Sequence, residues 1–138
     1  MNRTREQYRA GYALRFVKDY AKSGDKAKMH TLIQKAPIQI LQNGLGQMLA
    51  FLLADNEGKQ EKQKPSGILY RRIEEWLCGD LKEDRPCRVY LNDPKQEELI
   101  EQLTAGDRNQ YTQAQQEALA LFAWLKKFAD AWLKEGGK

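Results

Sequence analysis

The fold of this chain is decided by the stretch Lys35-Ala-Pro-Ile-Gln-Ile-Leu-Gln-Asn-Gly-Leu-Gly-Gln-Met-Leu-Ala-Phe-Leu-Leu-Ala54, which carries no charge after Lys35 although 30% of the chain is charged. Projected on a helix at about 100° per residue, its apolar residues gather on one side: Ile38, Leu41, Leu45, Met48, Leu49 and Leu52. The opposite side carries amides and small residues, namely Gln39, Asn43, Gly46, Gln47 and Ala50. Because the outer face of a surface helix is normally charged, this stretch predicts a helix whose outer face is covered by a partner.

The segments on both sides of this stretch also repeat their apolar residues with a helical period, and none alternates convincingly as a strand would. Helices are expected over residues 4–23, 26–36, 37–54, 67–78, 93–104 and 112–135. Pro37 is placed at the start of the third helix, because proline disfavours helix at the preceding residue and is tolerated in a first turn. Asn43-Gly44 is interpreted as part of that helix, and Thr112 as the cap of the last one, with Gln115 completing a capping box.

These periods predict an all-α fold, a compact single-domain bundle of five to six helices over residues 1–138. A chain of 138 residues is long enough for one domain with a real core. Residues 55–66 form a charged loop without large apolar side chains, and we expect this loop to be mobile.

The residue types that catalysis and metal binding require are not grouped in this sequence. His30 is the only histidine, and Cys78 and Cys87 have neither the spacing nor the partners of a zinc site. There is no glycine-rich phosphate loop and no carboxylate cluster with the spacing of metal ligands. We therefore expect no enzymatic activity, no metal and no cofactor.

Membrane insertion is also not expected. The first residues are charged rather than apolar, and the uncharged stretch contains Pro37 and four amides, which a spanning helix does not favour. The sequence is typical of a soluble, cytoplasmic protein.

Positive charge is concentrated in the first part of the chain. The net charge is +4, yet residues 1–54 contain nine Lys and Arg against three Asp and Glu. Arg15, Lys18 and Lys22 share one face of the first predicted helix, and Lys26 follows just beyond it. Such a row suits contacts with the phosphates of a nucleic acid, although a merely solvated helix face has the same pattern. Tyr8 and Tyr12 border the row, where they either stack on bases or close the edge of the core.

The last predicted helix offers a second candidate protein interface. Its outer face combines small residues such as Ala123 with Lys127, and Trp124 lies at the edge of that face. Tryptophan is a frequent anchor of protein contacts. The candidate interface residues are therefore Gln39, Asn43, Gln47, Ala123, Trp124 and Lys127.

Several short motifs resemble one known family, the small subunits of the type III-B CRISPR (Cmr) RNA-targeting complex. In the first part these are Tyr12-Ala13, Val17, Pro37, Ile40, Asn43-Gly44-Leu45-Gly46-Gln47 and Phe51. In the last part they are Tyr111-Thr112, Glu117-Ala118-Leu119 and Trp124-Leu125-Lys126-Lys127-Phe128-Ala129-Asp130-Ala131. The resemblance spans residues 8–54 and 110–133, and residues 55–109 add little to it.

The resemblance implies a non-catalytic small subunit of an RNA-guided complex that serves antiviral defence. It implies stacking along the guide–target duplex and contacts with the target RNA backbone. The implied partners are the backbone subunits, the large polymerase-like subunit, copies of itself, and guide and target RNA. The alternative is a helical protein–protein adaptor with no nucleic-acid contact. A helix-turn-helix DNA-binding protein is disfavoured, because residues 26–36 are too short and too apolar for a recognition helix.

Overall fold

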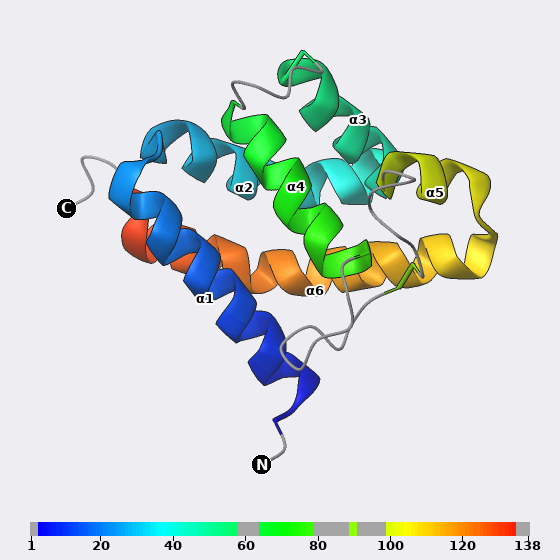
Figure 1. Cartoon of the computed structure of the whole chain (residues 1–138), viewed down its shortest axis with the longest axis horizontal. Helices are drawn as coiled ribbons and strands as arrows, with labels where there is room; N and C mark the ends of the chain where they lie inside the picture. The colour runs from blue at the N-terminus through cyan, green and yellow to red at the C-terminus, as the bar shows by residue number, and fades with distance from the viewer. Residues whose placement is uncertain (1–2, 58–63, 79–88, 91–98, 135–138) are drawn as a thin grey trace.

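The structure is a computed structural model that describes residues 3–57, 64–78, 89–90 and 99–134. Within these ranges the chain forms six helices and no strand, so the predicted all-α fold is confirmed (Figure 1). The helices are α1 (Arg5–Ser23), α2 (Lys26–Asn43), α3 (Leu45–Asp55), α4 (Pro65–Cys78), α5 (Leu99–Ala105) and α6 (Arg108–Trp132). None of the described helices is both long enough and apolar enough to cross a membrane.

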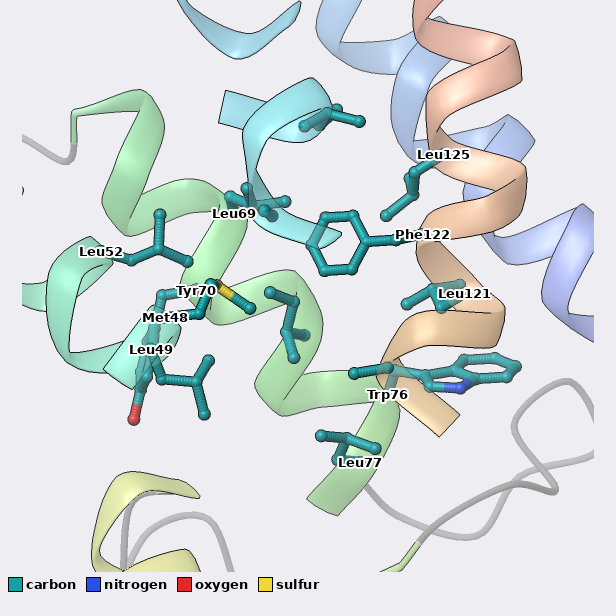
Figure 2. Packing of buried hydrophobic residues seen from close by; sticks show 14 of the residues in the cluster. Met48, Leu49, Leu52, Leu69, Tyr70, Trp76, Leu77, Leu121, Phe122 and Leu125 are labelled. Atoms are coloured by element: carbon teal, nitrogen blue, oxygen red, sulfur yellow. The ribbon is translucent and has the colours of Figure 1, made fainter. Parts of the chain in front are cut away.

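The long helix α6 supports the other helices. Both α1 and α2 pack against it, α4 packs against α2 and α3, and α5 packs against α3 (Figure 1). Trp76 and Tyr70 of α4, Met48 of α3 and Phe122 of α6 are among the largest fully buried side chains (Figure 2). One hydrophobic core therefore joins these helices.

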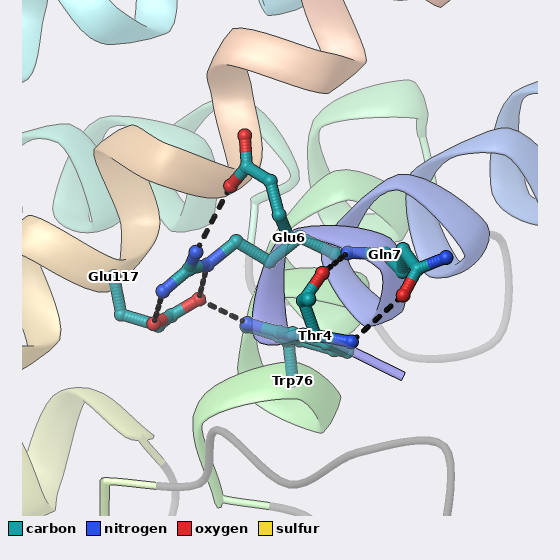
Figure 3. A network of polar contacts seen from close by, with 6 residues as sticks. Thr4, Glu6, Gln7, Trp76 and Glu117 are labelled. Atoms are coloured by element: carbon teal, nitrogen blue, oxygen red, sulfur yellow. Dashed lines mark hydrogen bonds and ion pairs between the residues drawn. The ribbon is translucent and has the colours of Figure 1, made fainter. Parts of the chain in front are cut away.

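Helix α1 begins where the sequence predicts, because side chains cap its first turn. The Thr4 hydroxyl accepts a hydrogen bond from the Gln7 amide at 3.1 Å, and the Gln7 side chain accepts one from the Thr4 amide at 2.8 Å (Figure 3). This reciprocal arrangement is a capping box. The buried face of the helix carries Tyr12, Ala13, Phe16 and Val17.

The uncharged stretch forms parts of two helices, and this corrects the boundary predicted at Pro37. Pro37 lies inside α2, which continues to Asn43, and the helix breaks at Gly44. Gly44 has φ 93° and ψ 159°, a backbone region that is essentially restricted to glycine. Asn43-Gly44 is therefore a helix boundary and not the helix interior that was predicted.

The position of the break also changes which residues face the core. Because α2 runs without interruption from Lys26, its buried side continues from Met29 through Ile33 to Ile40. Ile38 and Leu41, which were predicted to face inward, are 53% and 73% exposed. Beyond the break the prediction is confirmed, since Leu45, Met48, Leu49 and Leu52 are buried.

The charged segment at 55–66 is packed at both of its described ends. Asn56 is buried, and its side-chain oxygen accepts a hydrogen bond from the Lys64 amide at 2.8 Å. Ser66 is also buried, in the first turn of α4, which begins at Pro65 instead of at residue 67. Residues 58–63 lie outside the described residues, so the mobility of this loop stays a prediction.

Of two helix starts predicted in the second half of the chain, one is corrected by the structure. The predicted start of a helix at Asp93 lies outside the described residues, and α5 is described from Leu99. Helix α6 begins at Arg108 rather than at Thr112, because the Asp107 carboxylate accepts a hydrogen bond from the Gln110 amide at 2.8 Å and caps the helix.

Candidate nucleic-acid and protein interfaces

The cations predicted to bind RNA lie on or beside the outer face of α1. Arg15, Lys18 and Lys22 are all exposed, and their spacing places them on one side of the helix. Lys22 lies 3.9 Å from the Asp19 carboxylate, and both side chains are mostly in solvent, so this pair is weak. Lys26 is half-buried at the first position of α2.

These cations have different neighbours. Arg15 lines a groove between α1 and α4. The Lys18 ammonium instead lies 5.5 Å from the centroid of the Trp132 ring on α6, within the range of a cation–π contact. Trp132 is 42% exposed, and sequence reasoning missed it because the helical period places it with the core residues of α6. The face of α1 thus continues onto an exposed aromatic ring.

The groove between α1 and α4 has a volume of about 1020 Å³. Arg15 lines it from α1, and Arg71 and Arg72 line it from α4. Sequence reasoning missed both α4 arginines, because their only signal was a position outside the apolar stripe of their own helix. Two helices that are distant in sequence therefore place three guanidinium groups along one recess.

Aromatic rings line the α1 side of this groove, and one of them lies beneath the Arg72 guanidinium. The Arg72 guanidinium carbon is 5.7 Å from the centroid of the Phe16 ring, and the Phe16 and Tyr20 rings are 6.0 Å apart at 55°. The Tyr20 hydroxyl accepts a hydrogen bond from the Asp25 amide at 3.1 Å, and burial raises the pKa of Tyr20 above its usual 10.0. A Cβ atom on Gly24 would lie 2.3 Å from the Tyr20 ring, so this position has no room for a side chain.

The two tyrosines that border the cationic row have different roles. Tyr12 is 8% exposed, its hydroxyl donates a hydrogen bond to the Glu75 carboxylate at 2.6 Å, and its ring lies 4.7 Å from that of Trp76. Tyr12 therefore closes the core and presents no ring face to a base. Tyr8 is half-buried, and the Arg3 guanidinium covers its ring at 4.4 Å.

One cation of α1 is engaged inside the protein. Two nitrogens of Arg9 lie 2.7 and 2.8 Å from the two carboxylate oxygens of Glu117, and the Trp76 indole donates to the same carboxylate at 2.9 Å (Figure 3). The Arg9 and Glu117 side chains are only 16% and 8% exposed. Arg9 therefore joins α1 to α6 and is not a surface contact.

The predicted interface residues of α6 point in two directions. Ala123 and Lys127 line a second groove of about 520 Å³, together with Pro37 of α2 and Leu119 of α6. Trp124 is turned by about 100° from Ala123, and its ring stacks on Phe128 at 5.7 Å. The structure thus brings Ala123 and Lys127 together with α2 and places Trp124 on another flank.

The predicted interface residues of the uncharged stretch are also divided. Asn43 and Gln47 are exposed and Gln39 is half-buried. The larger apolar surface is offered by Ile38 and Leu41, which the sequence analysis assigned to the core. A partner that covers α2 would therefore meet exposed leucine and isoleucine in addition to amides.

The Asn43–Gln47 motif has a structural explanation. The Leu45 amide donates to the Gln115 side-chain oxygen at 2.9 Å, and the Gly46 amide donates to the Tyr111 hydroxyl at 3.0 Å. Both acceptors come from the start of α6. This motif and the Tyr111-Thr112 motif are therefore two halves of one contact.

His30 has a structural role within the described residues. Its Nε2 atom lies 2.8 Å from the Asp130 carboxylate, which also accepts a hydrogen bond from the Gln34 amide group at 2.9 Å. These contacts join α2 to α6. Over the described ranges no group of three His, Cys, Asp or Glu residues is placed to hold a metal ion. Cys78 is buried, and Cys87 lies outside the described residues.

Comparisons with known proteins agree over almost the whole chain. Residues 5–132 match the model of the Cas_Cmr5 family, described as a CRISPR-associated protein. The chain is 31% identical over 133 residues to the CRISPR system Cmr subunit Cmr5 of Thermus thermophilus, and the match covers 96% of this chain and 99% of that protein. The fold is similar to the crystal structure of a CRISPR-associated Cmr5 family protein from the same species, with a TM-score of 0.68 and 25% identity over 96% of this chain and 100% of that one.

Proposed function

The chain belongs to the Cmr5 family of CRISPR-associated proteins, and we propose that it acts as a non-catalytic small subunit of a type III-B Cmr effector complex in antiviral defence. In this role it stacks along the guide–target duplex beside the backbone subunits, the large polymerase-like subunit and further copies of itself. It contacts the sugar–phosphate backbone of the target RNA in the cytoplasm. Membership in a family of Cmr subunits supports the assembly part of this proposal.

The exposed row of Arg15, Lys18 and Lys22 is the observation that carries the RNA contact. Phosphate contacts of this kind position RNA without reading its sequence, which base pairing with the guide does. Three or four such contacts give a salt slope of only about −2 to −3 on a single strand, so one copy binds weakly. Several copies in register raise the effective concentration and make weak contacts useful.

A charge-reversal experiment tests the RNA contact. The variant Arg15→Glu/Lys18→Glu/Lys22→Glu is compared with the control Lys35→Glu/Arg108→Glu/Lys134→Glu, which changes three other exposed cations by the same total charge. Both variants are expected to fold and to copurify with the other Cmr subunits. Only the α1 variant should lose retention of labelled target RNA by the assembled complex. Equal retention by the α1 variant and the wild type would refute the RNA contact.

A purely protein-binding adaptor is the second candidate function, and the exposure of Ile38 and Leu41 favours it. Exposed apolar residues beside a groove are typical of an interface with another protein. The variant Leu41→Glu/Ala123→Glu places charge on this surface at two exposed positions. If assembly fails in this variant while the α1 variant keeps full RNA retention, the adaptor is the better description.

A further inference from the structure

We infer that the groove between α1 and α4 is a binding site for an unpaired nucleotide of single-stranded RNA, with Arg71 and Arg72 as its phosphate ligands. This inference rests on the proposed function, and it places part of the RNA contact in this groove, which could not be identified from the sequence alone. The groove volume of about 1020 Å³ is at the upper end of the range of small-molecule pockets, roughly 300–1,000 Å³.

Arg71 and Arg72 keep donor capacity in this structure. The Arg71 guanidinium lies 3.8 Å from the Glu74 carboxylate, and the Arg72 guanidinium lies 3.6 Å from that of Glu75. Both distances exceed a hydrogen bond, whereas Arg9 holds Glu117 at 2.7 Å. Since each guanidinium has five N–H donors in a planar fork, both arginines can bind phosphate oxygens in a bidentate manner.

The groove also holds a guanidinium plane on which a base can stack. The Arg72 guanidinium lies over the Phe16 ring at 5.7 Å, and Phe16 is only 7% exposed, so the ring supports the arginine from below. Unpaired bases stack on aromatic rings and on arginine planes. Bases inside a duplex have no free face, so this geometry favours an unpaired nucleotide.

The carboxylates of the groove are compatible with a nucleotide. Asp25 accepts a hydrogen bond from the Lys28 amide at 3.1 Å, and Glu75 accepts one from the Tyr12 hydroxyl at 2.6 Å. Asp19, also in the groove, is mostly exposed. A nucleotide can offer its 2′-hydroxyl and exocyclic amino groups to such an acceptor. The side chains of an acidic peptide segment carry no donors of this kind, so they cannot use these acceptors.

The test compares two variants, each of which removes two cations at consecutive positions, one on α4 and one on α6. Arg71→Gln/Arg72→Gln removes both groove arginines, and Lys126→Gln/Lys127→Gln removes the same charge from the second groove. Binding of a labelled single-stranded RNA of about 12 nucleotides is measured for the full chain by fluorescence anisotropy at several salt concentrations. The arginine variant should bind about tenfold more weakly, with a salt slope reduced by about 1.4, because each phosphate contact on a single strand contributes about 0.7. The lysine variant should change affinity less than about twofold.

A second measurement locates the contact independently of affinity. In nitrogen-15-labelled protein, the Nε–Hε signals of Arg71 and Arg72 should shift when the single-stranded RNA is added and should shift less with a blunt RNA duplex of the same sequence. Circular dichroism melting of the arginine variant should stay close to that of the wild type, since both arginines are nearly half exposed and neither approaches its carboxylate within hydrogen-bond distance. Glu74, which is only 8% exposed, keeps the hydrogen bond from the Leu99 amide at 2.9 Å in this variant.

Each contrary result has a separate meaning. Equal weakening by both pairs would show general electrostatic attraction and overturn the groove assignment while RNA binding stands. If only the variant Arg15→Glu/Lys18→Glu/Lys22→Glu weakened RNA binding, the assignment of Arg71 and Arg72 as phosphate ligands would also be overturned. Equal shifts with the duplex would overturn the preference for an unpaired nucleotide. Displacement of the RNA by a poly-glutamate peptide of equal charge would assign the groove to an acidic protein segment, and loss of RNA binding in every assay with the wild type would instead refute the proposed function.

Discussion

The hydroxyl of Tyr111 accepts a hydrogen bond from the backbone amide of Gly46 at 3.0 Å, across 65 positions of sequence. Tyr111 lies in the first turn of α6 and Gly46 in the first turn of α3. The first amides of a helix have no partner within the helix, and Gly44, which precedes α3, has no side chain to supply one. The start of α3 is therefore fixed by α6 and not by a local cap.

Removing the Tyr111 hydroxyl should weaken this connection. We expect Tyr111→Phe to lower the free energy of unfolding by about 1 kcal/mol, because it leaves a partly buried amide without an acceptor. Urea unfolding monitored by circular dichroism measures the change. Tyr8→Phe, which alters a half-buried ring on α1, serves as control and should stay within about 0.5 kcal/mol of the wild type. Equal effects of the two substitutions would contradict the capping role.

Substitution by alanine should change the stability of the protein in opposite directions at two glycines. Gly44→Ala should destabilise the protein by about 1–3 kcal/mol, because φ is 93° and the new Cβ would lie 2.8 Å from the Tyr111 hydroxyl. Gly11→Ala should stabilise it by up to about 1 kcal/mol, because Gly11 lies within α1 and a Cβ there meets nothing within 4 Å. Thermal unfolding of both variants provides the comparison. A stabilised Gly44→Ala variant would show that the break at Gly44 is not strained.

Removing only one partner of the buried ion pair between Arg9 and Glu117 should destabilise the protein. Arg9→Met is expected to lower the free energy of unfolding by about 3 kcal/mol, because among the described residues it leaves the buried carboxylate of Glu117 with one donor, the Trp76 indole. Urea unfolding followed by tryptophan fluorescence reports the loss. Arg5→Met, at an exposed position of the same helix, should have little effect. The double variant Arg9→Met/Glu117→Gln should recover part of the lost stability. A double variant that is less stable than Arg9→Met would argue against this account.

Tyr90 should make folding sensitive to alkaline pH. Its hydroxyl is buried and has no hydrogen-bond partner among the described residues, and burial raises the pKa of Tyr90 from 10.0 to about 12. The folded protein therefore keeps this proton in a pH window where the unfolded chain loses it, so the contribution of Tyr90 to stability falls as pH rises from about 10 to about 12. Tyr90→Phe should be neutral or slightly stabilising near pH 7, since it removes an unpaired buried hydroxyl. Unfolding measured across the alkaline window should show a shallower decline for the variant, and identical slopes would contradict the assignment.

Local sequence rules predicted the start of α1 and the buried face of α3. The capping box at Thr4 fixes the start of α1, and the apolar period beyond Gly44 fixes the buried face of α3. The same rules failed at the start of α6, where Asp107 and not Thr112 is the cap, and also where a distant contact decides. Proline favours a helix start, but Tyr111 and Gln115 satisfy the amides that follow Gly44, and so the break occurs there. The residues between Pro37 and Gly44 consequently keep the phase of α2, which exposes Ile38 and Leu41.

The candidate sites were predicted only in part, for a related reason. Helical spacing was enough to place Arg15, Lys18 and Lys22 on one exposed face of α1. The contribution of Arg71 and Arg72 depends on α4 lying beside α1, and no local pattern states which helices become neighbours. The proposed RNA and protein contacts themselves stay predictions until the variants above are measured.

The long-range pairing of Arg9 with Glu117 also has a consequence for protein synthesis. These residues are 108 positions apart, and α1 and α2 both pack against α6. At a translation rate of about 5–20 residues per second, a growing chain waits roughly 5–20 seconds between the synthesis of Arg9 and that of Glu117. Until α6 is synthesised, the part of α1 that packs against α6 has no native cover, so chaperones and neighbouring nascent chains on the same polysome can reach it first.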